Sequence, residues 1–478
     1  MTKILFDITV FKAGFSGIPQ DARRIFNILN DEGRFKLDAI IFPDSKAGTA
    51  FKTSARKDLN TLYKKSIAKS QIYGFKKPIF HRIKFFNRLN DLLGFLLIFF
   101  TLFKRVSIRT SLPVQELKRF LEKYFEVDDE IIETEKNFTK IKFANISSKF
   151  IHIFGTLGLK IRIDTRGYDF YFSPMPCPII VSPNTQLVVR YHDAIPITHP
   201  DLINTPESII YTYNVLKNCV KQDAIFVCNS ESSELELKEL FPNKNLKCLT
   251  IPCSVPETEK PNRTINYYEI FQCLSSNHAN EEQHKLEFIK SFLEKPYLIS
   301  IGNLEPKKNQ VRLLRAIRKL NSDGLNVNLV LIGNEGWKSE SVKQELSLAT
   351  NLGIVLHLQN VPRRILNNLI FRSSAYIFPS LIEGFGMGIA EAMANKKLVL
   401  CSDIPAHRYV TDNNALFFNP LSVASMISAI ERADKLITQD GDRKIVENAF
   451  IRSQLYSTRN TKLLWHDLFL QTKKKHQI

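Results

Sequence analysis

The sequence has little of what marks a secreted, fibrous or disordered chain. It contains 18 glycines and 21 prolines in 478 residues and has no Gly/Ser-rich or Pro-rich stretch, which excludes flexible linkers and low-complexity segments. The N-terminus carries Asp7 after only three apolar residues and has no cleavage-site pattern, so we expect no signal peptide and a cytoplasmic location. The seven cysteines include no C-x-x-C pair, and we expect buried, reduced thiols.

A run of 20 apolar residues, the length needed to span a bilayer, is also missing. The longest run, LLGFLLIFFTLF at 92–103, is flanked by basic residues across 76–109. Such a segment suits either a helix that lies in the interface of an anionic membrane, on the inner face of the plasma membrane, or a buried core helix. Both interpretations stay open.

Positively charged residues outnumber negatively charged ones. The net charge is +18, with 44% hydrophobic residues in a chain long enough for two or three domains. This balance suits a nucleic acid, a phosphorylated small molecule or an acidic membrane as partner. No RNA- or DNA-binding motif accompanies the charge, so we do not expect a nucleic-acid partner.

The two halves of the chain repeat one rhythm, in which short β-rich runs alternate with helix-length segments. The C-terminal runs are 297–302, 326–333, 353–358, 375–380, 397–402 and 415–418, and the N-terminal runs are 3–10, 36–42, 168–173, 186–193, 224–230 and 246–252. This alternation predicts an α/β protein with two Rossmann-like, doubly wound domains that face each other across a cleft. Ligands then bind at the carboxyl ends of the strands.

The same rhythm predicts the domain boundaries. We expect an N-terminal domain at 1–255 with a helical insertion at 45–150, a linker at 256–295, a C-terminal domain at 296–440, and C-terminal helices at 441–478 that pack back toward the N-terminal domain, anchored by Tyr456 and Trp465.

The segment EGFGMGIAEAMA, from 383 to 394, predicts an anion site. Its glycines allow a tight turn with close backbone approach, and a helix is expected to begin near Met387. The N–H groups and dipole of that helix favour a phosphate or pyrophosphate on the GFGM turn, which comprises Gly384, Phe385, Gly386 and Met387. Glu391 is then placed to accept hydrogen bonds from a ribose diol, and Glu383 points at the group that the phosphate carries.

Two further motifs follow predicted strands. In IGNLEPKKN, Lys307 and Lys308 are placed to neutralise a diphosphate leaving group. In VVRYHD, His192 ends a strand at the cleft, where it can hydrogen-bond a sugar hydroxyl or stabilise charge.

A loop with Gly14 and Gly17 precedes an amphipathic helix near 18–32 and allows close backbone approach to a ligand. It fails as a dinucleotide fingerprint, which disfavours an NAD-dependent oxidoreductase.

These four motifs, in this order, resemble the retaining glycosyltransferases of family 4, also called group 1 glycosyltransferases, which have the GT-B fold. The resemblance covers 168–254 and 297–435. It implies that Lys308, with Lys307, binds the donor diphosphate, that Glu391 holds the ribose and that Glu383 contacts the donor sugar. It further implies that His192 lines the reaction centre, that Gly17 belongs to a glycine loop near the diphosphate, and that Ser230 is a cleft-side serine.

The resemblance also implies a reaction. The expected activity is transfer of a sugar from a nucleotide-sugar, GDP- or UDP-linked, with retained configuration and with no metal or other cofactor. Mannosyltransferases of bacterial cell-surface polysaccharide synthesis are most similar, so GDP-mannose is the first expected donor and a glycan or lipid-linked glycan the expected acceptor. A catalytically silent partner subunit at the membrane and a UDP-sugar-dependent transferase are the alternatives.

Overall fold

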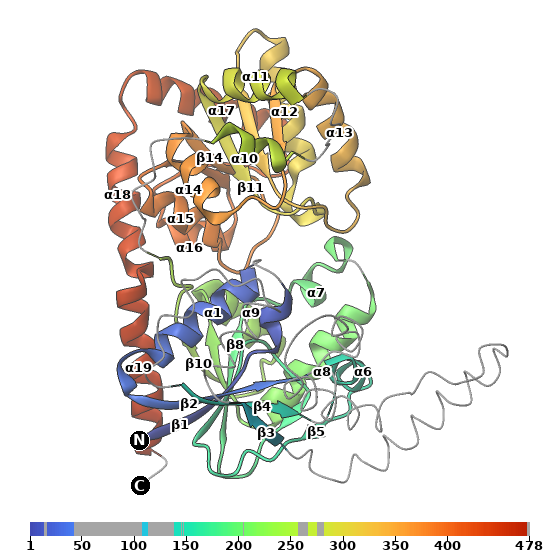
Figure 1. Ribbon diagram of the computed structural model, residues 1–478, viewed down its shortest axis with the longest axis vertical. Coiled ribbons are helices and arrows are strands. Elements are labelled where there is room, and N and C mark those ends of the chain that lie inside the picture. The colour runs from blue at the N-terminus through green and yellow to red at the C-terminus, as the bar shows by residue number, and fades with distance from the viewer. Residues whose placement is uncertain are drawn as a thin grey trace, which may run out of the picture.

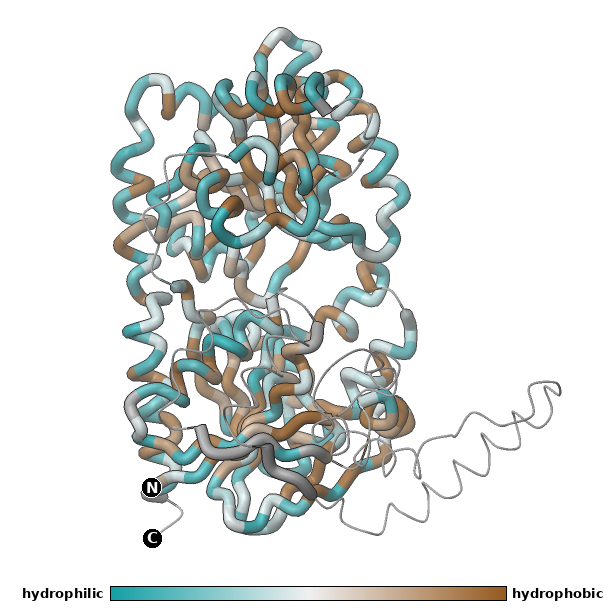
Figure 2. The backbone as a smooth tube through the Cα atoms, viewed as in Figure 1, coloured by the Kyte–Doolittle hydropathy of each residue, from teal (hydrophilic) through white to brown (hydrophobic). Residues whose placement is uncertain are grey.

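The computed structural model of the chain describes residues 1–13, 17–42, 108–112, 138–144, 146, 148–203, 205–256, 266–274 and 282–475. Within them, each half of the chain builds one large sheet between helices, and the two sheet domains lie one above the other in Figure 1. Figure 2 shows apolar residues along the central strands and polar residues on the outer turns. Parallel strands that are buried on both faces need such continuous apolar runs.

The N-terminal sheet has the order β10-β9-β8-β6-β1-β2-β4-β3, and every neighbouring pair except β3 and β4 is parallel. Its strands are β1 (Thr2–Asp7), β2 (Phe35–Ile41), β3 (Ile108–Leu112), β4 (Phe138–Ala144), β6 (Phe170–Ser173), β8 (Gln186–Tyr191), β9 (Ile225–Cys228) and β10 (Lys247–Thr250), and a separate pair is formed by β5 (Ile161–Arg162) and β7 (Ile179–Ile180). The accompanying helices are η1 (Thr9–Ala13), α1 (Gly17–Asn30), η2 (Asp31–Gly33), α6 (Ser148–Thr156), α7 (Ile195–Thr198), η4 (Pro200–Leu202), α8 (Glu207–Lys221) and α9 (Glu231–Leu240).

The range predicted as a helical insertion, 45–150, lies mostly outside the described residues. Its described parts are the strands β3 and β4 and the first turn of α6. Because β4 pairs with β2 and β3 pairs with β4, both strands extend the N-terminal sheet at one edge. The described strands of this range therefore belong to the sheet rather than to a separate helical unit.

The C-terminal sheet has the order β13-β12-β11-β14-β15-β16, and all of its strands are parallel. The strands are β11 (Tyr297–Ile301), β12 (Asn328–Ile332), β13 (Val355–Leu358), β14 (Ala375–Phe378), β15 (Leu398–Ser402) and β16 (Leu416–Phe418). The helices of this half are α10 (Tyr267–Gln272), α11 (Glu282–Leu293), η6 (Pro306–Lys308), α12 (Gln310–Ser322), α13 (Glu340–Asn351), α14 (Arg363–Arg372), α15 (Met387–Ala394), α16 (Pro405–Thr411), α17 (Val423–Thr438), α18 (Arg443–Ser453), η7 (Gln454–Tyr456) and α19 (Thr458–Lys475).

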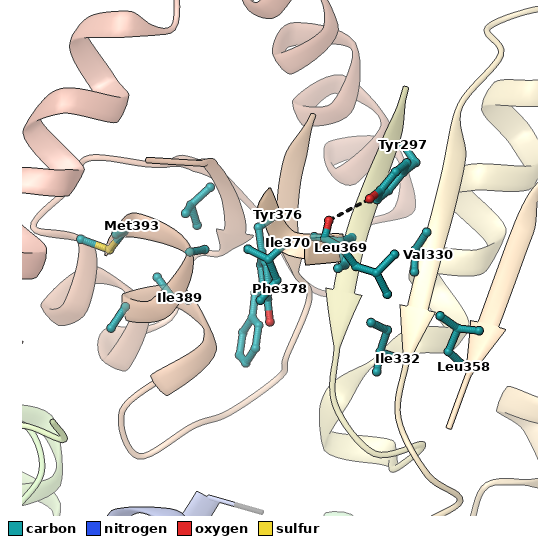
Figure 3. Close-up of a cluster of buried hydrophobic side chains, with 14 of the residues drawn as sticks. Tyr297, Val330, Ile332, Leu358, Leu369, Ile370, Tyr376, Phe378, Ile389 and Met393 are labelled. Carbon is teal, nitrogen blue, oxygen red and sulfur yellow. Dashed lines mark hydrogen bonds between the residues drawn. The ribbon is translucent and has the colours of Figure 1, made fainter. Parts of the chain in front are cut away.

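Each sheet is covered by an apolar core on both faces. In the C-terminal domain, helices α10, α11, α14 and α15 pack on one face, and helices α12, α13 and α17 pack on the other. Figure 3 shows the first of these cores, in which the Tyr297 hydroxyl also donates a 2.8 Å hydrogen bond to the Leu369 carbonyl. Such a bond satisfies a polar group that would otherwise be costly to bury. The two covered sheets are the doubly wound arrangement that the sequence predicted.

The chain passes between the domains twice, and the two passages lie side by side. Val255 pairs with Ser457 in a parallel bridge, and the Val255 N–H donates to the Tyr456 carbonyl at 2.7 Å. After the second passage, α19 runs along the N-terminal domain (Figure 1), where Trp465 and Phe469 pack against Phe172. The C-terminal helix thus ties the two ends of the chain together.

Among the residues that the structure describes, no helix is long and apolar enough to cross a membrane. All seven cysteines are free thiols, and all but Cys248 are buried. The apolar run at 92–103 lies outside the described residues.

Candidate active site

The strand order locates the candidate site. In the C-terminal sheet, the order reverses between β11 and β14, so the loops that follow these strands leave toward opposite faces and open a crevice between them. The loop after β11 carries Lys307 and Lys308, and the loop after β14 carries Glu383 and the GFGM turn. The predicted donor-site residues therefore meet at the switch point of this sheet.

The lysine loop is held rigidly. Asn309 ends the short helix η6 in the left-handed conformation, with φ of 58°, which asparagine tolerates better than most residues. Its side-chain amide donates to the carbonyls of Pro379 and Pro420 at 2.9 and 2.8 Å. The Leu381 N–H donates to the Lys307 carbonyl at 2.8 Å. The loops after β11 and β14 are thus joined directly.

Lys308 and Glu383 form an ion pair across these two loops. The Lys308 Nζ lies 2.6 Å from the Glu383 Oε1, and the Ser380 hydroxyl donates to the same oxygen at 2.8 Å. Burial raises the pKa of Glu383, but the charges of Lys308 and Lys307 outweigh it and lower that pKa to about 2. Glu383 is therefore a carboxylate at any physiological pH.

Lys307 extends this charge cluster to the other domain. Burial lowers the pKa of Lys307, whereas the negative charges of Glu383, Asp193 and Glu305 act in the opposite direction and leave that pKa raised. Asp193 lies two residues after the end of β8 of the N-terminal domain. Lys307 thus lies between carboxylates of both domains.

The GFGM turn docks on the N-terminal domain. A Cβ atom at Gly384 would lie 2.2 Å from the His192 carbonyl oxygen, so only glycine permits this approach. The Gly384 carbonyl accepts hydrogen bonds from Ser230 and Ser233, at 2.6 and 3.1 Å. Gly386, with φ of 103°, caps α15 in a conformation that favours glycine.

The other members of the turn differ in how a ligand can reach them. The Phe385 ring is buried against Tyr409 and Tyr456, so only the backbone of Phe385 can face a ligand. Met387 is the first residue of α15, and its Cε lies 3.6 Å from the Cβ position of Gly17 at the start of α1. The N-terminal N–H groups of α15 are the anion-binding end of that helix.

Glu391 lies one turn into α15 and is paired with two arginines. Arg24, from α1 of the opposite domain, approaches its Oε1 at 2.9 Å, and Arg363 approaches the same oxygen at 3.3 Å. Burial raises the pKa of Glu391, and the two guanidinium groups more than offset that effect, so the pKa is lowered. Arg24 also donates to the Ser254 carbonyl at 2.5 Å, in the first interdomain passage. Glu391 therefore combines a predicted ribose-binding position with an interdomain ion pair.

His192 lies beside the buried ion pair of Asp21 and Arg190. Its Nε2 is 3.2 Å from the Pro174 carbonyl and 4.0 Å from the Asp21 carboxylate, which itself pairs with Arg190 at 2.7 Å. Burial lowers the pKa of His192, and although Asp21 opposes this, the pKa stays below its usual value. The imidazole is therefore neutral near pH 7. Asp193, its neighbour in sequence, caps the Ile195 N–H instead, at 3.1 Å.

The structure thus places the predicted residues of the C-terminal domain around the switch point, and it places Gly17, His192 and Ser230 of the N-terminal domain against the GFGM turn. Gly14 lies outside the described residues. Sequence reasoning missed the charged residues behind the predicted ones, namely Asp21, Arg24, Arg190 and Arg363. A signal existed for Asp21, because it falls on the apolar face that Ala22, Ile25 and Leu29 bury on α1, where an unpartnered carboxylate is not expected. In the described part of the chain, no group of three or more His, Cys, Asp or Glu residues is arranged to hold a metal ion.

Two doubly wound domains that meet at the carboxyl ends of their strands define the GT-B fold of glycosyltransferases, and solved structures agree. Sucrose-phosphate synthase from Thermosynechococcus elongatus superposes with a TM-score of 0.56 over 99% of this chain and 100% of that chain, at 14% identity. Anabaena Alr3699/HepE in complex with UDP and glucose superposes with a TM-score of 0.52 over 98% and 100%, also at 14% identity. The predicted fold class is confirmed.

The sequence family agrees with the fold. Residues 282–450 match the family model described as "Glycosyl transferases group 1". The serotype-specific mannosyltransferase WbdA of Escherichia coli is 34% identical over 137 residues, which are 28% of this chain and 17% of WbdA. The O-antigen chain mannosyltransferase RfbU of Salmonella typhimurium is 31% identical over 153 residues, 32% of this chain and 42% of RfbU. The chain therefore carries a group 1 glycosyltransferase domain that resembles mannosyltransferases, and it spans less than half the length of either relative.

Proposed function

We propose that the protein is a retaining glycosyltransferase that moves mannose from GDP-mannose to a glycan or lipid-linked glycan in the synthesis of a bacterial surface polysaccharide. The observation that carries the proposal is the Lys308–Glu383 pair at the switch point, beside the N-terminus of α15. The names of the mannosyltransferases WbdA and RfbU support the choice of sugar and of pathway. A UDP-linked donor is the alternative, to be decided by experiment.

Each site residue has a role in this proposal. Lys307, Lys308 and the N–H groups at the start of α15 hold the diphosphate, with Gly17 close to it, and Glu391 holds the ribose. Glu383 accepts hydrogen bonds from donor-sugar hydroxyls, and it stays ionised because its pKa is about 2. His192, which is neutral, faces the reaction centre as a hydrogen-bonding group.

The reaction follows from this placement. The bond between the anomeric carbon and the diphosphate oxygen breaks while the acceptor oxygen bonds to that carbon on the same face. The acceptor proton passes to the departing diphosphate, whose charge the two lysines and the α15 dipole stabilise. We propose that no metal or other cofactor takes part. The domain junction excludes water, which suppresses hydrolysis of the donor.

Location is part of the proposal. We propose that the protein acts in the cytoplasm, at the inner face of the plasma membrane, and that residues 76–109 contact anionic lipid. This segment lies outside the described residues apart from its last two, which begin β3.

Glu383→Gln tests the proposal. The variant removes the carboxylate charge that faces Lys308, and we expect the transfer rate to fall by about 10²- to 10³-fold, as for loss of one preorganised electrostatic contact. The measurement is transfer of labelled mannose from GDP-mannose to lipid-linked glycan, with UDP-glucose in parallel and the anomeric configuration read by NMR.

Glu431→Gln, at an exposed glutamate of α17, is the matched control and should transfer at the wild-type rate. Full activity of Glu383→Gln would contradict the role of Glu383. Absence of transfer from either donor by the wild-type protein would favour a catalytically silent partner subunit.

A further inference from the structure

A further contact between the domains lies on the α7 side of the junction (Figure 1). The Trp337 indole N–H donates to the Leu202 carbonyl at 3.0 Å, and the neighbouring Lys338 ammonium donates to the Asp201 carbonyl at 3.2 Å. Trp337 follows β12 of the C-terminal domain, whereas Leu202 ends η4 of the N-terminal domain. Neither residue belongs to the candidate site described above.

On its own domain, the loop that carries Trp337 is packed directly on the lysine loop. The Leu304 N–H donates to the Asn334 carbonyl at 2.9 Å, and the Gly336 N–H donates back to the Leu304 carbonyl at 3.2 Å. A Cβ atom at Gly333 would lie 2.0 Å from the Gly302 carbonyl oxygen. Because no side chain fits between the two loops, Trp337 and the lysines form one rigid unit.

On the opposite domain, Leu202 is connected to His192 through short, hydrogen-bonded turns. The Ala194 N–H donates to Glu236 at 2.9 Å, directly after Asp193. The His199 N–H then donates to the Ile195 carbonyl at 2.8 Å, and the Leu202 N–H donates to the His199 carbonyl at 3.1 Å. Consecutive hydrogen-bonded turns therefore join Leu202 to the segment that contains His192 and Asp193.

We propose that Trp337 is a positioning residue, whose hydrogen bond to Leu202 holds the His192–Asp193 segment in register with Lys307 and Lys308. The inference rests on the proposed transferase function, which divides the reacting groups between the two domains. The contacts of Gly384 and of Glu391 join the domains near α9 and α1. Trp337 and the adjacent Lys338 add a contact near α7, which restrains the relative orientation of the domains on a separate side of the junction.

Trp337→Phe removes the N–H donor and keeps an aromatic ring. We expect kcat for transfer to fall about tenfold, as expected for a small misplacement of reacting groups, while the Kd for GDP measured by calorimetry stays within twofold of wild type. Tyr268→Phe, at an exposed tyrosine of α10, is the matched control. An unchanged kcat would overturn the inference, and an equal loss in GDP affinity would make Trp337 part of the donor site instead.

A readout that does not depend on activity separates this inference from the proposed function. Backbone hydrogen exchange should rise in residues 195–203 of Trp337→Phe and stay unchanged in residues 303–309, which lie on the other side of the lost bond. This result is expected even if the wild-type protein transfers no sugar. Unchanged exchange in 195–203 would overturn the positioning role, whatever the transfer assay gives.

Discussion

At the switch point, neighbouring charge dominates the pKa of Glu383, whereas burial dominates the pKa of His407. Glu383 is stabilised as an anion by the two lysines, which lower its pKa to about 2. His407 on α16 is fully buried, and burial lowers its pKa to about 4, against weaker opposing effects from Glu383 and the Ser402 carbonyl. Its Nδ1 lies 2.9 Å from that carbonyl. At physiological pH the site thus holds an ionised carboxylate and a neutral imidazole.

This neutral histidine makes stability depend on pH. The unfolded chain binds a proton at His407 near pH 6.5, whereas the folded chain does so only near pH 4, so stability is lost as pH falls through this window, by up to about 3 kcal/mol. His407→Asn keeps a donor for the Ser402 carbonyl and should flatten the pH dependence of the unfolding free energy between pH 6.5 and 4. Denaturant unfolding at several pH values measures it.

The exposed His284 of α11 offers the control, because His284→Asn should leave that pH dependence unchanged. A slope in His407→Asn equal to that of the wild type would contradict the buried neutral state of His407.

At the scale of elements, the strands were predicted far better than the contacts between domains. All twelve β-rich runs of the sequence form strands of the two sheets, because a parallel strand buried on both faces must be apolar throughout. The start of α15 at Met387 was also predicted, from the glycines before it. Strands β3 and β4 were missed: β3 is the edge strand of the sheet, which need not be apolar on both faces, and the run FTKIKFA of β4 alternates with polar residues.

The loop residues of the candidate site were predicted from the sequence, whereas the charged residues that pair with them or lie behind them were not. Glycine turns and adjacent lysines are local patterns, so Gly384, Gly386, Lys307 and Lys308 could be located without a structure. The pairing of Glu391 with Arg24 joins residues 367 positions apart, and no local pattern predicts such a contact.

Replacing Gly384 tests the contact between the GFGM turn and the N-terminal domain. In Gly384→Ala, the added Cβ would lie 2.2 Å from the His192 carbonyl oxygen, and separation of the domains is the cheapest way to relieve the overlap. We expect transfer to fall at least about tenfold, because the reacting groups move apart, while the melting temperature falls by only a few degrees, because neither core is touched. Rate assays and thermal unfolding measure both.

Gly441→Ala is the comparison variant, since its Cβ first meets the flexible end of Leu436, at 3.2 Å. Wild-type transfer by Gly384→Ala would show that the close contact between the GFGM turn and the N-terminal domain is unimportant for the reaction.

At the scale of the whole molecule, the described residues connect the domains through two adjacent passages and through contacts that include those of Gly384, Glu391 and Trp337. The passages pair through Val255 and Ser457, and α19 returns to pack on the N-terminal sheet. Arg24 contacts both the first passage and Glu391. A ligand that engages Glu391 therefore also acts on the contact that holds the domains together.

Calorimetric titration of GDP and UDP into the wild-type protein tests most directly whether the switch point of the C-terminal sheet binds a nucleoside diphosphate. We predict that GDP binds and that Lys308→Ala and Glu391→Ala each weaken binding by about 10- to 100-fold, the effect of losing a charged hydrogen-bonding partner. Lys435→Ala, at an exposed lysine of α17, should bind like the wild type. Binding that neither site variant weakens, or no binding of either nucleotide, would contradict the account.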